Sequence, residues 1–161
     1  MSKKRIFAAI VLWCLTLVWA VFIFVMSAKT SQESDGVSGG VIRLLAGWFV
    51  PDFGSMSEAQ AAEFVEGLQN LVRKLGHLSE FALLGCLLCS SLRMGVKGAT
   101  AAIWAFVIGS VYGISDEIHQ LFVPGRACQI TDMLIDSLGG LLGVLFITAV
   151  VWIYKKIKRR V

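Results

Sequence analysis

Long apolar runs alternate with shorter polar segments along the chain, and four of the runs are long enough, or nearly so, to cross a bilayer as helices. A membrane-spanning helix needs about 20 mainly apolar residues. The pattern therefore predicts an all-α integral membrane protein with four transmembrane helices. The expected spans are residues 6–26, 75–92, 99–118 and 130–154.

The polar segment between the first two spans, residues 27–74, is expected to form short extracytoplasmic helices of amphipathic or interfacial type. Residues 41–50 are apolar but too few to span, which suits a helix lying in the headgroup plane. Ser57 and Gln60 have the spacing of a capping box, and apolar residues follow at three- and four-residue intervals. A helix beginning there can continue directly into the second span. The hydroxyl-rich residues 27–36 are interpreted as a helix end and a hydrated loop, and the alternative is that their hydroxyls overhang the functional site.

Composition supports a membrane protein, and the charge pattern gives its orientation. The hydrophobic fraction is 57%, above the roughly 45–50% of soluble domains. Cytoplasmic loops are enriched in Lys and Arg, and an inside amino terminus makes all but five of the 15 basic residues cytoplasmic. All 11 acids then fall on the outer side. We therefore expect both termini inside and the working face outside. The net charge of +4 becomes a basic inner rim suited to anionic membrane lipid, with no implication of nucleic-acid binding.

Ionisable residues next to the apolar runs indicate a functional site. Such a residue inside a membrane segment costs roughly 2.5–3.5 kcal/mol on insertion scales and by default faces the bundle interior or water. The predicted topology brings the start of the second span, the end of the third and the start of the fourth to the same depth in the outer leaflet. We therefore predict one acid-rich, water-facing pocket. Its candidate ligand-binding residues are Lys74, His77, Glu80, Asp116, Glu117, Gln120, Arg126, Asp132 and Asp136.

Helical spacing predicts how these side chains are oriented. Glu117 and Gln120 share one stripe of the third span and are expected to face inward. Asp116 and His119 lie on the neighbouring stripe, so they are expected to be divided between the rim of the site and a neighbouring element. In the fourth span, Gly139 begins a small-x-x-x-small pattern on roughly the same face as the two acids. That face is expected to pack inside the bundle.

The acids of the predicted pocket outnumber its cations, and buried charges must be paired, protonated or bound to metal. The excess negative charge can be accommodated in three ways: by protonated carboxyls, by a bound divalent cation, or by a pocket that is open to water. A mixed imidazole and carboxylate set suits zinc or manganese. The Cys86-x-x-Cys89 spacing lies within a span and is interpreted as packing. The candidate metal ligands are His77, Glu80, Glu117, Asp132 and Asp136.

Three spaced motifs resemble the VanZ-like family over roughly residues 10–152. They are Lys74-x-x-His77-x-x-Glu80-Phe81, Asp116-Glu117-x-x-Gln120-x-Phe122-x-Pro124-Gly125-Arg126 and Asp132-x-x-x-Asp136-x-x-Gly139. The chain departs from the family at two positions, with Asp136 where Asn is frequent and Phe81 where Tyr is common. The resemblance implies one VanZ-like membrane domain over residues 1–161, located in the plasma membrane of a bacterium.

The family is named for a membrane protein associated with low-level resistance to teicoplanin, a glycopeptide that acts outside the cell. The resemblance therefore implies an envelope protein whose outer site binds a lipid-linked cell-wall precursor or a lipoglycopeptide. In this hypothesis Lys74 and Arg126 pair with anionic groups of the ligand.

Two other functions stay open at this point. One is a membrane-embedded hydrolase or transferase acting on a phosphate- or sugar-bearing lipid, with His77, Glu80 and Glu117 as catalytic candidates for acid–base chemistry. The other is proton- or ion-coupled transport. The inner halves of all four spans lack ionisable residues, which speaks against transport.

Overall fold

The computed structural model describes residues 2–159, and every regular element in that part of the chain is a helix. Four of these helices are long and apolar enough to cross a membrane, namely α1, α3, α4 and α5. The predicted all-α architecture with four candidate spans is confirmed. The elements are α1 (Lys3–Ser27), α2 (Ser31–Phe49), the 3-10 helix η1 (Phe53–Ser55), α3 (Glu58–Leu92), α4 (Gly98–Gln120) and α5 (Ile130–Lys158).

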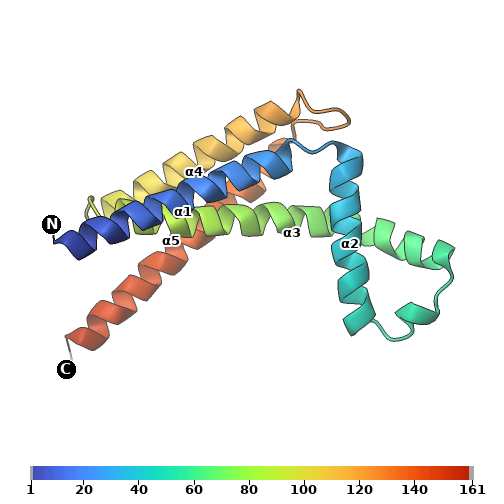
Figure 1. Cartoon of the computed structure of the whole chain (residues 1–161), viewed down its shortest axis with the longest axis horizontal. Coiled ribbons are helices and arrows are strands. Elements are labelled where there is room, and N and C mark those ends of the chain that lie inside the picture. Colours follow the sequence, from blue (N-terminus) through green and yellow to red (C-terminus); the bar gives the residue numbers. More distant parts are fainter. Residues whose placement is uncertain (1, 160–161) are drawn as a thin grey trace.

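The four long helices lie side by side as a bundle with two distinct ends (Figure 1). One end, which we call the termini end, holds the start of α1, the end of α5 and the turn from α3 to α4. The other, which we call the loop end, holds the link from α1 to α2 and the loop from α4 to α5. Helix α2 crosses α3 steeply at the loop end, and the first turns of α3 extend beyond it (Figure 1).

Helices α3 and α5 form the closest contact in the bundle. A Cβ on Gly139 would overlap the carbonyl oxygen of Leu78, and a Cβ on Gly143 would overlap that of Ala82. The glycines therefore let the two backbones touch, which confirms the expected packing of this face. Because Asp136 lies one turn before Gly139 on α5, the same contact brings its side chain against α3.

The apolar core lies where the four long helices meet. Large apolar side chains on the outer surfaces, such as Phe7, Leu17 and Phe146, are exposed, as expected of helices surrounded by lipid. The core thus fixes the relative positions of the helices that carry the polar residues. Its buried members are Ile23, Phe81, Leu84, Leu88, Cys89, Ala105 and Val144.

Helix α2 differs from the sequence prediction, because it begins ten residues before the expected short helix, within the predicted loop. The Thr30 hydroxyl accepts a hydrogen bond from the Glu33 N–H, and the Glu33 carboxylate accepts one from the Thr30 N–H at 2.8 Å. This capping box starts the helix at Ser31. Small residues then let α2 approach α3, since a Cβ on Gly39 would lie 3.4 Å from a methyl group of Val65.

Helix α3 bears out two predictions. Ser57 and Gln60 form the expected capping box at its start. The helix then continues without interruption from the segment beneath α2 into the second candidate span, ending at Leu92. One rigid element therefore carries the amphipathic turns, Lys74, His77 and Glu80.

Candidate functional site

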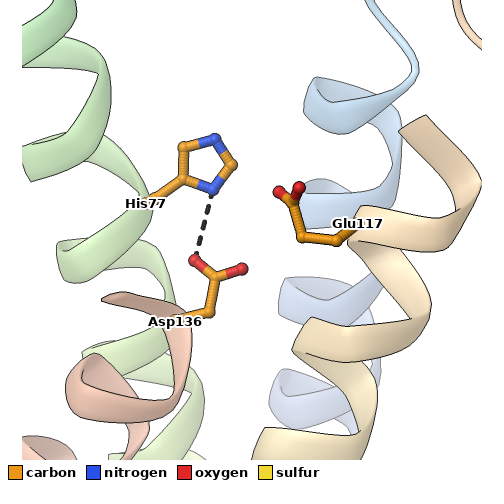
Figure 2. Close-up of side chains that lie close together, drawn as sticks. All are labelled: His77, Glu117 and Asp136. Atoms are coloured by element: carbon orange, nitrogen blue, oxygen red, sulfur yellow. Dashed lines mark hydrogen bonds and ion pairs between the residues drawn. The ribbon is translucent and has the colours of Figure 1, made fainter. Parts of the chain in front are cut away.

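Three side chains from three helices meet inside the loop end (Figure 2). His77 comes from α3, Glu117 from α4 and Asp136 from α5, and one potential ligand atom of each lies within 4.8 Å of the others. His77 Nδ1 lies 3.2 Å from Asp136 Oδ1. Glu117 and Asp136 are both fully buried, with an exposed fraction of 0%. We call these three residues the buried triad.

The carboxylates of the buried triad are incompletely satisfied. Glu117 Oε2 accepts a hydrogen bond from the backbone N–H of Gln129 at 2.9 Å. In the described part of the chain, Glu117 Oε1 and Asp136 Oδ2 are buried and have no hydrogen-bond partner, and the same holds for Asp116 Oδ2. A buried polar atom without a partner is costly. The triad therefore has free acceptor atoms suited to a hydrogen-bond donor or a cation.

A glycine on α4 makes room for this arrangement. A Cβ on Gly113 would lie 3.0 Å from Asp136 Cβ and 3.2 Å from Phe81 Cε1, which is tighter than ordinary contact. Gly113 and Glu117 are four residues apart and so share a face of the helix. The absence of a side chain at 113 lets α4 approach α5, so that Glu117 points toward Asp136.

A second charged pair lies next to the triad. Lys74 Nζ lies 2.9 Å from Asp132 Oδ1, and the Asp132 side chain is only 10% exposed. Lys74 is three residues before His77 and Asp132 is four residues before Asp136, so this pair links the same two helices. The Lys74 charge therefore offsets that of Asp132, which leaves the triad to balance its own charge.

A cavity of about 680 Å³ opens beside the triad, bordered by α2, α3 and the end of α1. The imidazole of His77 forms part of its wall, so the triad is connected to the cavity through this residue. The other polar side chains that line the cavity are cations, acids and hydroxyls. These residues are Ser27, Lys29, Ser34, Ser38, Arg73, Ser79, Glu80, Asp116 and Arg126.

The guanidinium of Arg126 lines the cavity, and its positive charge is not neutralised by an ion pair with any described residue. Its Nε donates a hydrogen bond to the carbonyl oxygen of Lys29 at 3.3 Å, and it forms no ion pair with any described carboxylate. Burial, followed by the nearby charge of Arg73, lowers the pKa of Arg126 below its ordinary value. Arg73 itself pairs with Asp35 at 3.3 Å. This corner of the cavity is therefore suited to an anion.

Comparison with protein families identifies the chain. A sequence model of the family described as VanZ/LLP1 matches residues 12–153. The chain belongs to the VanZ-like family. This family is associated with glycopeptide resistance, and together with the four apolar helices it marks a membrane protein. The match includes every residue of the triad and of the Lys74–Asp132 pair. No curated protein and no solved structure matches the chain.

The structure of this VanZ-like protein separates the predicted metal candidates. His77, Glu117 and Asp136 form the group that could hold an ion, whereas Glu80 and Asp132 lie outside that group. Glu80 lines the cavity and Asp132 pairs with lysine, so a site with all five ligands does not form. For Glu80 the reason is rotation along α3, since a step of three residues from His77 turns the side chain by about 60°.

Helix α4 shows which directions the polar side chains of the third span take. Glu117 is buried as expected, and Gln120 is buried but donates a hydrogen bond to Ser27 Oγ of α1 at 3.1 Å. Asp116 lines the cavity. His119 faces α1 instead, where its ring lies 4.6 Å from that of Phe24. Asp116 and His119 are thus divided between the site and a neighbouring helix, as predicted.

The sequence favoured a hydrated loop over hydroxyls that overhang the site, so the contribution of a helix, α2, to the cavity was not predicted. Ser34 and Ser38 line it together with apolar residues of the same helix. The available signal was a run of small and hydroxyl residues at three- and four-residue spacing after the Thr30 capping box. Hydropathy does not detect such a stripe, because its members are not apolar. The apolar α2 residues on the cavity are Val37, Val41 and Leu45.

Proposed function

We propose that this VanZ-like protein binds an amphiphile with an anionic head in the cavity beside the buried triad. The chemistry fits a lipid-linked cell-wall precursor or a lipoglycopeptide. The observation that carries the proposal is the composition of the cavity lining, which combines apolar residues of α2 with Arg126, a cation without an ion pair among the described residues.

The size and lining of the cavity support this proposal. Small-molecule sites usually occupy about 300–1,000 Å³ and combine apolar walls with a few polar groups. The cavity of about 680 Å³ has this character. Val37, Val41 and Leu45 offer contact to an acyl or isoprenoid chain, while His77 and Glu80 offer polar contacts to a head group.

The cationic corner indicates the charge of the head group. A guanidinium recognises a phosphate or carboxylate through two parallel hydrogen bonds. Arg126 and Arg73 lie near each other with one partner carboxylate, that of Asp35. An anionic group of the ligand placed between them would offset the repulsion and the burial of Arg126.

For the membrane setting, we propose the plasma membrane of a bacterium, with the whole chain as one multi-pass domain, both termini inside and the cavity outside. Basic residues at the termini end support this orientation under the positive-inside rule. The last turn of α5 contains Lys155, Lys156 and Lys158, and α1 begins with Lys3 and Lys4. Helix α2 and the end of α1, which line the cavity, lie at the opposite end of the bundle (Figure 1).

The Arg126→Ala substitution tests the proposal. Binding of teicoplanin and of a purified lipid-linked wall precursor is measured by native mass spectrometry in detergent, and teicoplanin susceptibility is measured in cells. Hydrogen bonds to charged groups contribute about 1.5–3 kcal/mol, so a loss of roughly 10–100-fold in affinity is expected. Resistance should fall in parallel.

Arg43→Ala is the matched control, because Arg43 is exposed and pairs with Glu58 outside the cavity. It should leave binding and susceptibility unchanged. Unaltered binding in the Arg126 variant, or an equal loss in the Arg43 variant, would contradict the proposal.

The triad also supports a second candidate function, acid–base catalysis on a phosphate- or sugar-bearing lipid. The His77–Asp136 contact is the arrangement in which a carboxylate orients an imidazole for proton transfer, and His77 borders the cavity. Purified protein incubated with such lipids should form a product that His77→Gln and Glu117→Gln abolish. Absence of product from the wild type, with and without divalent metal, would exclude this activity for the lipids used.

A further inference from the structure

We propose that His77, Glu117 and Asp136 bind one divalent transition-metal ion, Zn²⁺ or Mn²⁺, with a coordination position left open toward the cavity. The ion-binding part of this proposal stands on the buried triad alone. The occupant of the open position, an anionic oxygen of the ligand, rests on the proposed function.

The first observation is the state of the two carboxylates. Each has one oxygen in a protein contact, since Glu117 Oε2 accepts from the Gln129 N–H and Asp136 Oδ1 contacts His77. The other oxygen of each is buried with no partner among the described residues. Both residues have an exposed fraction of 0%, so bulk water does not satisfy these atoms. Each carboxylate therefore presents one free oxygen within the same small volume (Figure 2).

The second observation is the spacing of the donor atoms. Ligand atoms about 2.0–2.2 Å from a tetrahedral zinc lie roughly 3.3–3.6 Å from one another. His77 Nδ1 and Asp136 Oδ1 are 3.2 Å apart, close to the separation of two neighbouring ligands of one ion, so an ion bound to both atoms would replace their direct contact. The potential ligand atoms of the three residues all lie within 4.8 Å of one another.

The third observation is local charge. Lys74 already pairs with Asp132, and Arg126 lies on the cavity wall rather than in the triad. Glu117 and Asp136 are thus two buried acids with one imidazole between them. A divalent cation offsets both charges at once, and a mixed nitrogen and oxygen donor set is typical of zinc and manganese.

Three protein ligands leave a further position on the ion. Zinc sites of this kind hold water or substrate in the fourth position. Of the three residues of the triad, His77 lines the cavity, whereas Glu117 and Asp136 do not. The open position is accordingly assigned to the His77 side of the triad, toward the cavity, where it would accept a phosphate or carboxylate oxygen of the head group.

The test uses the full chain, purified in detergent and stripped with a chelator. Zn²⁺ or Mn²⁺ is added, the excess is removed, and the retained metal is measured by elemental mass spectrometry. One ion per chain is expected. Co²⁺ in place of zinc should give the intense visible absorption bands of a tetrahedral nitrogen and oxygen site. His77→Gln, Glu117→Gln and Asp136→Asn should each weaken binding by about 100-fold, judged from the 10–100-fold effects of residues that only support metal ligands.

Glu80→Gln is the matched control, because it removes an acid from the same cavity but not from the triad. It should keep one ion per chain. Wild-type protein that retains far less than one ion per chain, or an equal loss in the Glu80 variant, would overturn the proposal. Size-exclusion profiles identify variants that fail to fold, and in that case the Co²⁺ spectrum of the wild type decides.

The same preparations separate this proposal from the proposed function. Arg126→Ala should lose amphiphile binding while keeping the ion. Amphiphile binding by a wild-type protein that retains no ion would overturn the metal site alone. Retained metal without any binding of teicoplanin or wall precursor would overturn the proposed function alone.

Discussion

The two ends of the bundle satisfy their polar groups in different ways. In the termini half, Thr16 Oγ1 and Ser91 Oγ share a hydrogen bond of 2.9 Å between α1 and α3. Arg93 donates to Thr148 Oγ1 at 2.9 Å between α3 and α5. At the loop end, by contrast, Glu117 and Asp136 are buried with a free oxygen each.

This contrast distinguishes packing from function. Polar side chains that are hydrogen-bonded between helices stabilise the helix contacts, typically by about 0.6 kcal/mol each. Unmatched buried acids lower stability, and natural proteins break such rules mainly at functional sites. We therefore assign the satisfied polar contacts of the termini half to packing, and the unsatisfied acids of the loop end to the proposed site. The predictions below test that division.

The largest loss of stability is expected from a substitution in the apolar core. Leu88→Ala removes a side chain that is 5% exposed and should lower the free energy of unfolding by about 2–5 kcal/mol. Metal retention by the folded protein should not change, because Leu88 lies outside the triad. SDS titration in detergent measures the first quantity and elemental analysis the second. Leu83→Ala, at a position 42% exposed, is the control and should cost much less.

The next effect concerns the contact between α3 and α5. Gly139→Ala places a methyl group against the Leu78 carbonyl oxygen and should destabilise by about 1–3 kcal/mol. It should also weaken metal binding, since the helices that hold His77 and Asp136 are pushed apart. Gly140→Ala is the control, because a Cβ there meets no atom within 4 Å. Equal effects of the two substitutions would mean that the helices do not touch at Gly139.

A smaller change in the free energy of unfolding, in the stabilising direction, is expected for Glu117→Gln in the presence of a chelator. The amide oxygen of glutamine can still accept the hydrogen bond from the Gln129 N–H, and the substitution removes one buried negative charge. The free energy of unfolding should therefore rise by about 1 kcal/mol. Glu63→Gln, at an exposed position of α3, should change nothing. A loss of stability in the chelated Glu117 variant would show that this carboxylate is satisfied in the native protein.

The smallest effect belongs to the hydroxyl pair of the termini half. Ser91→Ala removes the hydrogen bond to Thr16 and should cost about 0.6 kcal/mol. Ser79→Ala is the control, because this exposed hydroxyl bonds only to the Gly76 carbonyl of its own helix. A cost of several kcal/mol at Ser91 would place a major polar anchor in the half assigned to apolar packing.

Much of the fold could be predicted from the chain because its signals are local. The lengths of the apolar runs give the spans, and the Ser57 capping box gives the start of α3. The convergence of His77, Glu117 and Asp136 also followed, because three spans that run in known directions must bring their polar ends to one depth.

The remaining features depend on contacts between distant segments. Helix α2 was not predicted over its full length, since Gly36, Gly39 and Gly40 oppose helix formation and only packing on α3 compensates. The pairing of Lys74 with Asp132, and the exclusion of Glu80 from the triad, follow from the rotation of α3 against α5. That rotation is set by the glycine contact, which hydropathy does not encode.

The central claim is that α4 and α5 bring positions 117 and 136 together inside the loop end. Cross-linking in native membranes with a short bifunctional thiol reagent tests this claim most directly. The four native cysteines are first replaced by alanine. The Glu117→Cys/Asp136→Cys pair should cross-link efficiently. The Ile118→Cys/Asp136→Cys pair should not, because Ile118 faces outward and is 48% exposed. Equal cross-linking of both pairs, or none in the first, would contradict the account.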